Sequence, residues 1–308
     1  MNSRDKYKEL TKGPVERFDQ RNDMFRRARY DPEWMERATK FYGPMQVKDK
    51  PGYALEFQAL QNGAWYLERN FGMGVYGSNH DGLLAWETTN REKALLRPDL
   101  KIDASDLVMT TKKIKAAARH YGASLVGVCE LDRRWVYSHV SDDLTRGHEP
   151  MEIPGEYRYA IAMAIEMDYN LVKTSPTAGA AAATGIGYSK MAFIAGLLAQ
   201  FIRGLGFKAI PCGNDTALSI PIAIEAGLGE LGQVRIGVLP QLQEALVLVT
   251  GRLVVADLIK QPGKLEDVTG FEHPDEDVIG ARRQETTVLG DGSGGITPCH
   301  VHSGPPVS

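Results

Sequence analysis

Hydrophobic residues recur at helical and strand spacings in the middle of the chain. Apolar residues in helical register, each run followed by glycine, predict two long helices. Denser apolar runs without that period predict buried strands, although for 157–168 periodicity alone also allows a helix. In chain order the predicted elements are helix 106–121, strand 123–131, strand 157–168, helix 184–206, strand 207–213 and helix 219–229. This alternation is typical of layered α/β folds, in which ligands tend to bind where loops leave the ends of strands.

The first hundred residues are different, because they are polar and interrupted by Pro and Gly. We expect a few helices and long loops that cover the core. Trp34, Trp65 and Trp86 are expected to pack, with lining of a pocket as the alternative. "FRRARY" (25–30) is interpreted as a solvated helix face.

Composition narrows the class of protein. The chain has 308 residues, is 43% hydrophobic and 24% charged, and carries a formal net charge of −3. These values are ordinary for a globular protein and give no basic footprint for nucleic acid. No apolar run approaches the roughly 18 residues of a membrane span, and residues 1–10 lack the apolar core of a secretory signal.

The three cysteines are too few and too far apart for a disulfide framework, and no CxxC pair indicates a metal site. Cys129 and Cys212 lie in apolar runs and are expected to be buried. Cys299 lies near His300 and His302 in a Gly-, Pro- and Ser-rich tail. We interpret that tail as flexible, with incidental histidines, in preference to a metal cluster.

Two small-residue segments flank predicted elements and carry polar groups. In "CGNDTALS" (212–219), Asn214, Asp215, Thr216 and Ser219 are candidates for ligand contacts; the alternative is that Asp215, Thr216 or Ser219 caps the next helix. "SPTAGAAAATGIGYSK" (175–190) is interpreted as a loop whose backbone can approach a ligand. Tyr188 at its end is a candidate proton donor, or an ordinary packed aromatic.

Longer motifs point to a family. "GYSKMAFIAGLLAQFIRGLGFKAIPCGNDTALSIPIAIEAGLGELG" and "YGASLVGVCELDRRWVYSH" closely resemble the corrinoid-binding core of respiratory reductive dehalogenases. "RFDQRNDMFRRARYDPEW" and "NHDGLLAWETTN" are similar to the family's N-terminal region. The resemblance covers roughly residues 10–232. The epoxyqueuosine reductases are broader relatives, but they act on tRNA, for which no basic patch is visible.

The resemblance implies a nitroreductase-like α/β domain that binds cobalamin, whose reduced cobalt cleaves a carbon–halogen bond. Tyr188 matches the family's proton-donating tyrosine, and Asn214 matches the asparagine that supports it. The implied cofactor contacts are Thr184, Gly187, Thr216, Ala217, Leu218 and Ser219. The implied partners are a small organohalide substrate and an electron donor or membrane anchor protein. The family's location is the outer face of the cytoplasmic membrane; no export leader is visible here, so the cytoplasm is the alternative.

The resemblance ends after "GELG" (229–232). The family's catalytic arginine would fall near Val247, and Arg252 lies nearby in another sequence context. Two [4Fe–4S] clusters are expected in the family, but a single downstream cysteine cannot hold a cubane. A frameshift near residue 233 is one hypothesis, in which case the strand-like composition of 244–259 would be accidental.

The sequence thus predicts an N-terminal region (1–105), a corrinoid-binding core (106–232) and a divergent, possibly frameshifted or disordered tail (233–308). The predicted activity is cobalamin-dependent reductive dehalogenation, impaired in this chain. Two alternatives stay open: a corrinoid-binding module without catalysis, and a non-functional remnant.

Overall fold

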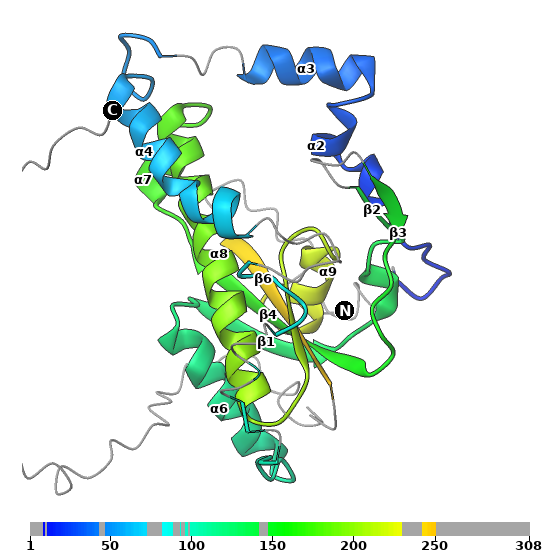
Figure 1. The fold of residues 1–308 in the computed structure, drawn as a ribbon. Coiled ribbons are helices and arrows are strands. Elements are labelled where there is room, and N and C mark those ends of the chain that lie inside the picture. The colour runs from blue at the N-terminus through cyan, green and yellow to red at the C-terminus, as the bar shows by residue number, and fades with distance from the viewer. Residues whose placement is uncertain are drawn as a thin grey trace, which may run out of the picture. The chain divides into compact units, whose positions relative to one another are not determined.

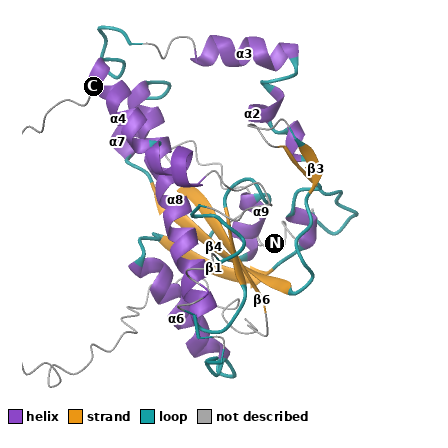
Figure 2. Ribbon diagram, viewed as in Figure 1, coloured by secondary structure: helices purple, strands orange, loops and turns teal. Residues whose placement is uncertain are grey.

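The computed structural model describes residues 9, 11–42, 47–72, 82–88, 93, 96–97, 99–141 and 147–229, and the backbone alone of 242–250. A four-stranded sheet lies among helices in the core (Figures 1 and 2). Its strands are β1 (Leu125–Glu130), β4 (Tyr157–Glu166), β5 (Ala209–Cys212) and β6 (Leu242–Thr250). The core helices are α6 (Leu107–His120), α7 (Tyr169–Val172), α8 (Ala178–Gly204) and α9 (Ser219–Glu225).

The strand order is β1-β4-β6-β5, and each of these neighbouring pairs is antiparallel. The expected layering of helices on a sheet is present, but these pairings differ from the parallel ladders of doubly wound folds. The strand composition of 244–259 is confirmed for its first part, since β6 pairs with β4 on one side and β5 on the other. The division at residue 233 stays a prediction, although pairing of the sheet continues beyond it.

Alternation along β4 explains why both faces of the sheet are covered. Tyr159, Ile161 and Met163 point into one buried cluster with residues of α6 and α8. Ala160 and Ala162 point into a second cluster with residues of α9 and of η4 (Arg133–Trp135). Because successive side chains of a strand face opposite ways, a strand between two helical layers is apolar throughout.

The longest helix is also the most deeply buried one. Met191, Ile194, Leu198 and Ile202 of α8 are at most 2% exposed. The helix ends where the sequence predicts, because Gly206 has the left-handed φ of +89° that favours glycine after a helix. Contrary to the expectation from sequence, α8 has the length and mean hydropathy (1.3) to cross a membrane. However, 56% of that apolar window is buried in the fold, as in a core helix.

The long helix corrects one expectation about its own start. Helix was predicted from residue 184, with a loop over 175–190. The structure begins α8 at Ala178, where Thr177 accepts the Ala180 N–H as an N-cap. Thr184, Gly187 and Tyr188 therefore lie within a continuous helix. Alanine is the best helix former, and the run of small residues that suggested a loop is largely alanine.

The N-terminal region contains short helices, as expected. They are η1 (Gln20–Asn22), α2 (Met24–Arg27), α3 (Pro32–Tyr42), α4 (Leu55–Ala64) and the π-helical turn η3 (Glu68–Gly72). The α4 helix packs along α8, where Ser189 Oγ donates to the Ala64 carbonyl at 2.6 Å. The segment before α2 is instead tied to a small hairpin of β2 (His139–Ser141) and β3 (His148–Pro150). Arg17 donates there to the Val136, Tyr137 and Met151 carbonyls.

Candidate functional site

Tyr188 and Asn214 meet between α8 and the loop that joins β5 to α9. The Asn214 Nδ2 amide donates to the Tyr188 hydroxyl oxygen at 3.1 Å, and both residues are half-buried. The Asn214 backbone is held in turn by the Tyr137 hydroxyl, which donates to its carbonyl at 3.3 Å. Because the phenol oxygen accepts the amide hydrogen bond, its own proton stays available for another acceptor.

The surroundings of Tyr188 act on its acidity in opposite directions. Burial raises the pKa of the phenol above its ordinary value, and the Glu68 carboxylate acts the same way. The Asn214 hydrogen bond and the Arg26 guanidinium lower that pKa, although burial dominates. The Asp23 carboxylate, paired with Arg26, raises the pKa as well. The group is therefore a neutral phenol at physiological pH.

Trp65 forms one wall beside this phenol. Its ring stacks on the Tyr188 ring with centroids 5.2 Å apart and an interplanar angle of 23°. The indole Nε1 donates to the Ala181 carbonyl at 3.1 Å, which fixes the ring against α8. A Cβ on Gly185 would overlap the indole, so the close approach requires glycine there. Trp65 therefore packs, as expected, and it does so against the candidate proton donor.

Two carboxyl groups lie near the phenol. Burial, followed by the charge of Asp215, raises the pKa of Glu68 to about 7. Burial likewise raises the pKa of Asp215, which accepts a hydrogen bond from the Thr216 hydroxyl at 3.3 Å. The Glu68 Oε2 atom has no hydrogen-bond partner among the described residues. A buried carboxyl oxygen without a partner favours the protonated acid or a group that binds there.

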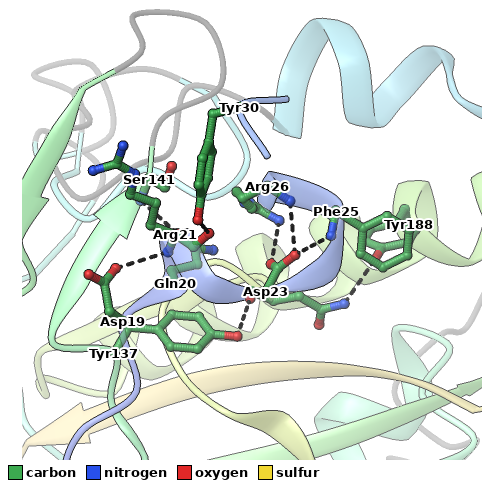
Figure 3. Close-up of polar contacts among 11 residues, drawn as sticks. Asp19, Gln20, Arg21, Asp23, Phe25, Arg26, Tyr30, Tyr137, Ser141 and Tyr188 are labelled. Atoms are coloured by element: carbon green, nitrogen blue, oxygen red, sulfur yellow. Dashed lines mark hydrogen bonds and ion pairs between the residues drawn. The ribbon is translucent and has the colours of Figure 1, made fainter. Parts of the chain in front are cut away.

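Arg26 brings a cation to the same site from the N-terminal segment. Its guanidinium is paired with Asp23 at 3.0 Å, and Asp23 also accepts the Phe25 and Arg26 N–H groups (Figure 3). The guanidinium lowers the pKa values of both Tyr188 and Asp215. The interpretation of 25–30 as a solvated face is wrong for Arg26, whose side chain is only 17% exposed.

The predicted cofactor contacts differ in accessibility. Thr184 and Ser219 are half-buried, and their hydroxyls donate to the Ala180 carbonyl and to Asn214 Oδ1, respectively. Leu218 is half-buried against the second core cluster. Gly187, Thr216 and Ala217 are buried. Their roles toward a cofactor stay predictions.

The capping alternative for the loop is wrong. The N-cap of α9 is Leu218, and no side chain accepts a bond from its first turn. Ser219 is already inside the helix, and its hydroxyl contacts Asn214 at 3.4 Å. The polar groups of 214–219 therefore bond to one another, not to the start of the helix.

The other sequence candidates behave more simply. Cys129 and Cys212 are 4% and 0% exposed, as expected, and burial raises the pKa of each thiol, that of Cys129 to about 12. Trp86 packs against the second core cluster, and the guanidinium groups of Arg27 and Arg37 each lie over the Trp34 ring. Cys299, His300, His302 and Arg252 lie outside the described residues.

Comparison with known proteins tests the predicted resemblance to reductive dehalogenases. No protein-family model matches the chain. It is 37% identical over 158 residues to the tetrachloroethene reductive dehalogenase of Dehalobacter restrictus, and 31% identical over 227 residues to that of Sulfurospirillum multivorans. Its sequence relatives are reductive dehalogenases. The predicted resemblance to the reductive dehalogenases is thereby confirmed.

The likeness to these dehalogenases is partial in length. The two alignments cover 40% and 65% of this chain, but only 28% and 45% of the relatives. Among solved structures, the catabolic reductive dehalogenase NpRdhA in complex with 3-bromo-4-hydroxybenzoic acid aligns over 77% of this chain at 22% identity, with a TM-score of 0.48. The alignment covers 31% of that structure. A reductive dehalogenase structure interpreted in terms of B12-dependent dehalogenation aligns with a TM-score of 0.46.

Sequence reasoning missed Arg26 and Glu68 as charged members of the site, and it named Asp215 without foreseeing its burial. Arg26 and Glu68 lie in the irregular first hundred residues, where periodicity gives no direction for a side chain. Asp215 was considered only as a ligand contact or a cap. The sequence did contain a signal for Glu68, because this residue follows the aromatic residues around Trp65. A carboxyl group that is buried among aromatic side chains is often a functional group.

Proposed function

We propose that the chain contains the corrinoid-binding part of a reductive dehalogenase, with a nitroreductase-like core, and that its reaction is reductive cleavage of a carbon–halogen bond. The observation that supports this most directly is the Asn214 hydrogen bond to Tyr188 at 3.1 Å. It joins the two residues that the family resemblance assigns as proton donor and its support. They come from segments 26 residues apart, so local structure alone does not bring them together.

The proposed reaction takes up two electrons and one proton. The carbon–halogen bond breaks, a carbon–hydrogen bond forms, and the halogen leaves as halide. Tyr188 delivers the proton from its hydroxyl. Asn214 keeps its amide hydrogen on the phenolate oxygen, and Arg26 lowers the cost of the negative charge. Trp65, stacked on the phenol, holds the ring in place and excludes water from one side.

The residues fit a cobalamin bound beside this pair. When bound, the corrinoid would supply the reduced cobalt that attacks the carbon–halogen bond. Half-buried amide and hydroxyl groups of Asn214 and Ser219 match the amide arms of a corrin, and the Glu68 oxygen without a partner offers another polar contact.

Two parts of the proposed machinery have no match in this sequence. Val247, near which the family's arginine was expected, lies in β6, where the backbone pairs with Ile161 and Pro211. We propose that Arg26 is the cation that acts on the phenol instead. The printed sequence has three cysteines, of which two are buried in the core, and a cubane needs four thiolates. We therefore propose little turnover by this sequence without an added electron source.

The substrate and location are proposed from the same relatives. The named relatives act on tetrachloroethene, so a small organohalide is the proposed substrate class. An electron-donor or membrane-anchor protein is the proposed partner, at the outer face of the cytoplasmic membrane, with the cytoplasm as the alternative.

The test is a cobalamin titration of the purified chain, followed by ultraviolet–visible spectroscopy and then by halide release with a low-potential chemical reductant. Tyr188→Phe should bind cobalamin like the unmodified chain and release halide about 10²- to 10⁴-fold more slowly, the usual contribution of a general acid. Tyr121→Phe is the matched control, because that tyrosine lies at the end of α6. Equal halide release by all three proteins would favour a corrinoid carrier without catalysis. A chain without a cooperative thermal melt would favour a remnant.

A further inference from the structure

A second cluster of chemically capable side chains lies outside the site described above. Asp19, His139 and His148 each offer one ligand atom, and these atoms lie within 4.8 Å of one another. They come from the N-terminal segment, from β2 and from β3, so the cluster exists only in the folded chain. We propose that these three side chains form a binding site for a divalent transition-metal ion that clips the N-terminal segment to the hairpin.

The individual contacts already arrange the ligands. The His148 Nε2 atom lies 3.0 Å from each oxygen of Asp19. Asp19 Oδ1 accepts the Arg21 N–H at 2.9 Å, which orients the carboxylate (Figure 3). Its Oδ2 contacts His148 Nε2, so an ion would take the place of that contact. His139 Nδ1 contacts the Ser138 hydroxyl at 3.2 Å, and a proton on Nδ1 would leave Nε2 as the ligand.

The three ligand atoms must move closer together to hold an ion. Zinc binds imidazole nitrogen at about 2.0–2.1 Å and carboxylate oxygen at about 2.0–2.2 Å, so tetrahedral ligand atoms lie a little over 3 Å apart. The His139 and His148 rings are stacked with centroids 4.7 Å apart and 26° between planes, so both rings must turn to direct one nitrogen each toward a shared ion. Asp19 and His148 have side chains 27% and 34% exposed, which leaves a path for the ion.

Ligand chemistry selects the metal class. Two imidazoles and one carboxylate suit Zn²⁺, Ni²⁺ or Cu²⁺, whereas Mg²⁺ and Ca²⁺ prefer oxygen ligands alone. Three protein ligands leave a fourth position for water. The site would act mainly on structure: Asp19 directly precedes η1 and α2, which carry Arg26 toward Tyr188.

The test uses the full-length untagged chain and Zn²⁺ in a calorimetric titration. One ion should bind per chain, and the thermal midpoint should rise with Zn²⁺ because the ion binds the folded state. Asp19→Asn and His148→Ala should each weaken binding at least about tenfold. Asp19→Asn is the milder change, because an amide can still accept the Arg21 N–H. Hydrogen exchange should show Zn²⁺-dependent protection of residues 11–22 and of the hairpin.

A double variant, His300→Ala with His302→Ala, removes the two histidines beside Cys299 and should leave the affinity unchanged. Co²⁺ added in place of Zn²⁺ should give the intense visible bands of a four-coordinate site, and those bands should be absent in His148→Ala. The proposal is overturned if the tail variant abolishes binding, or if Asp19→Asn and His148→Ala bind as tightly as the unmodified chain. These outcomes do not depend on cobalamin or on dehalogenation.

Discussion

The core around α8 and the segment of residues 11–42 are held by different forces. In the core, apolar side chains of α8 and β4 are almost completely removed from water. In the segment, Arg17 donates to three backbone carbonyls, and Gln20 accepts the Ser141 N–H at 2.9 Å. Met24, Phe25 and Met35 there are 46–62% exposed.

This difference has a consequence for the site. Burial of apolar surface is cooperative and resists local opening, whereas a few hydrogen bonds at the surface can break without unfolding the rest. Tyr188 and Asn214 belong to the rigid core, but Arg26 belongs to the loosely held segment. The donor pair should therefore persist under conditions in which the cation has moved away.

The largest expected effect breaks the core itself. Leu198→Ala removes a fully buried side chain and should cost about 2–5 kcal/mol of unfolding free energy, because a cavity remains. Phe193→Ala on the same helix is the control, since that side chain is 42% exposed and should cost well under half as much. Urea denaturation measures both. Equal losses would contradict the claim that α8 is stabilised by its buried face.

The next effect concerns Glu68, which lies in η3 where the N-terminal region packs against α8. Its pKa is raised to about 7 from 4.5, so the folded chain keeps a proton that the unfolded chain releases. Stability should fall as the pH rises from about 4.5 through 7, by up to about 3 kcal/mol. Glu68→Gln should lose this slope and be the more stable protein at pH 8.

The control for that change is Glu56→Gln on the exposed side of α4, which should keep the original slope. The measurement is the difference in unfolding free energy between each variant and the unmodified chain from pH 5 to pH 8. A Glu68→Gln difference that does not vary with pH would show that the carboxyl titrates normally.

A smaller and more local effect is expected for Arg17→Ala. Three carbonyls lose a charged donor, at a cost of about 1–3 kcal/mol that should fall mainly on the N-terminal segment. Hydrogen exchange in residues 11–42 should accelerate, while exchange in α8 stays the same. Arg37→Ala, which removes an exposed pair with Glu33, should change neither. Faster exchange throughout α8 would mean that the segment and the core unfold together.

The smallest expected change in stability comes from a test of the Trp65 ring, which stacks on Tyr188. Gly185→Ala gains helix propensity of about 1 kcal/mol but forces the Trp65 ring away from Tyr188, so the two terms should nearly cancel in stability. Tryptophan fluorescence should nevertheless change. Gly204→Ala, with open space around its added methyl group, should gain the propensity without the spectral change. Unchanged fluorescence in Gly185→Ala would place the indole elsewhere.

The sequence by itself determined α6, β1, β4, β5, α9 and the body of α8, but not the short elements η4, β2, β3 and α7. Their periodicity is local, and burial on one or both faces leaves a direct record in the order of apolar residues. It also led, through resemblance, to Tyr188 and Asn214. It misplaced the start of α8, because a run of alanine and glycine is compatible with a close-approach loop as well as with a helix.

Only the tertiary structure decided which distant groups meet. The contact of Tyr188 with Asn214, the position of Arg26, and the approach of Asp19 to His139 and His148 each join segments that no local pattern relates. The insertion of β6 between β4 and β5 is of the same kind. Such contacts depend on how whole elements pack. The periodicity of apolar residues along the sequence does not indicate which distant residue a polar side chain will contact.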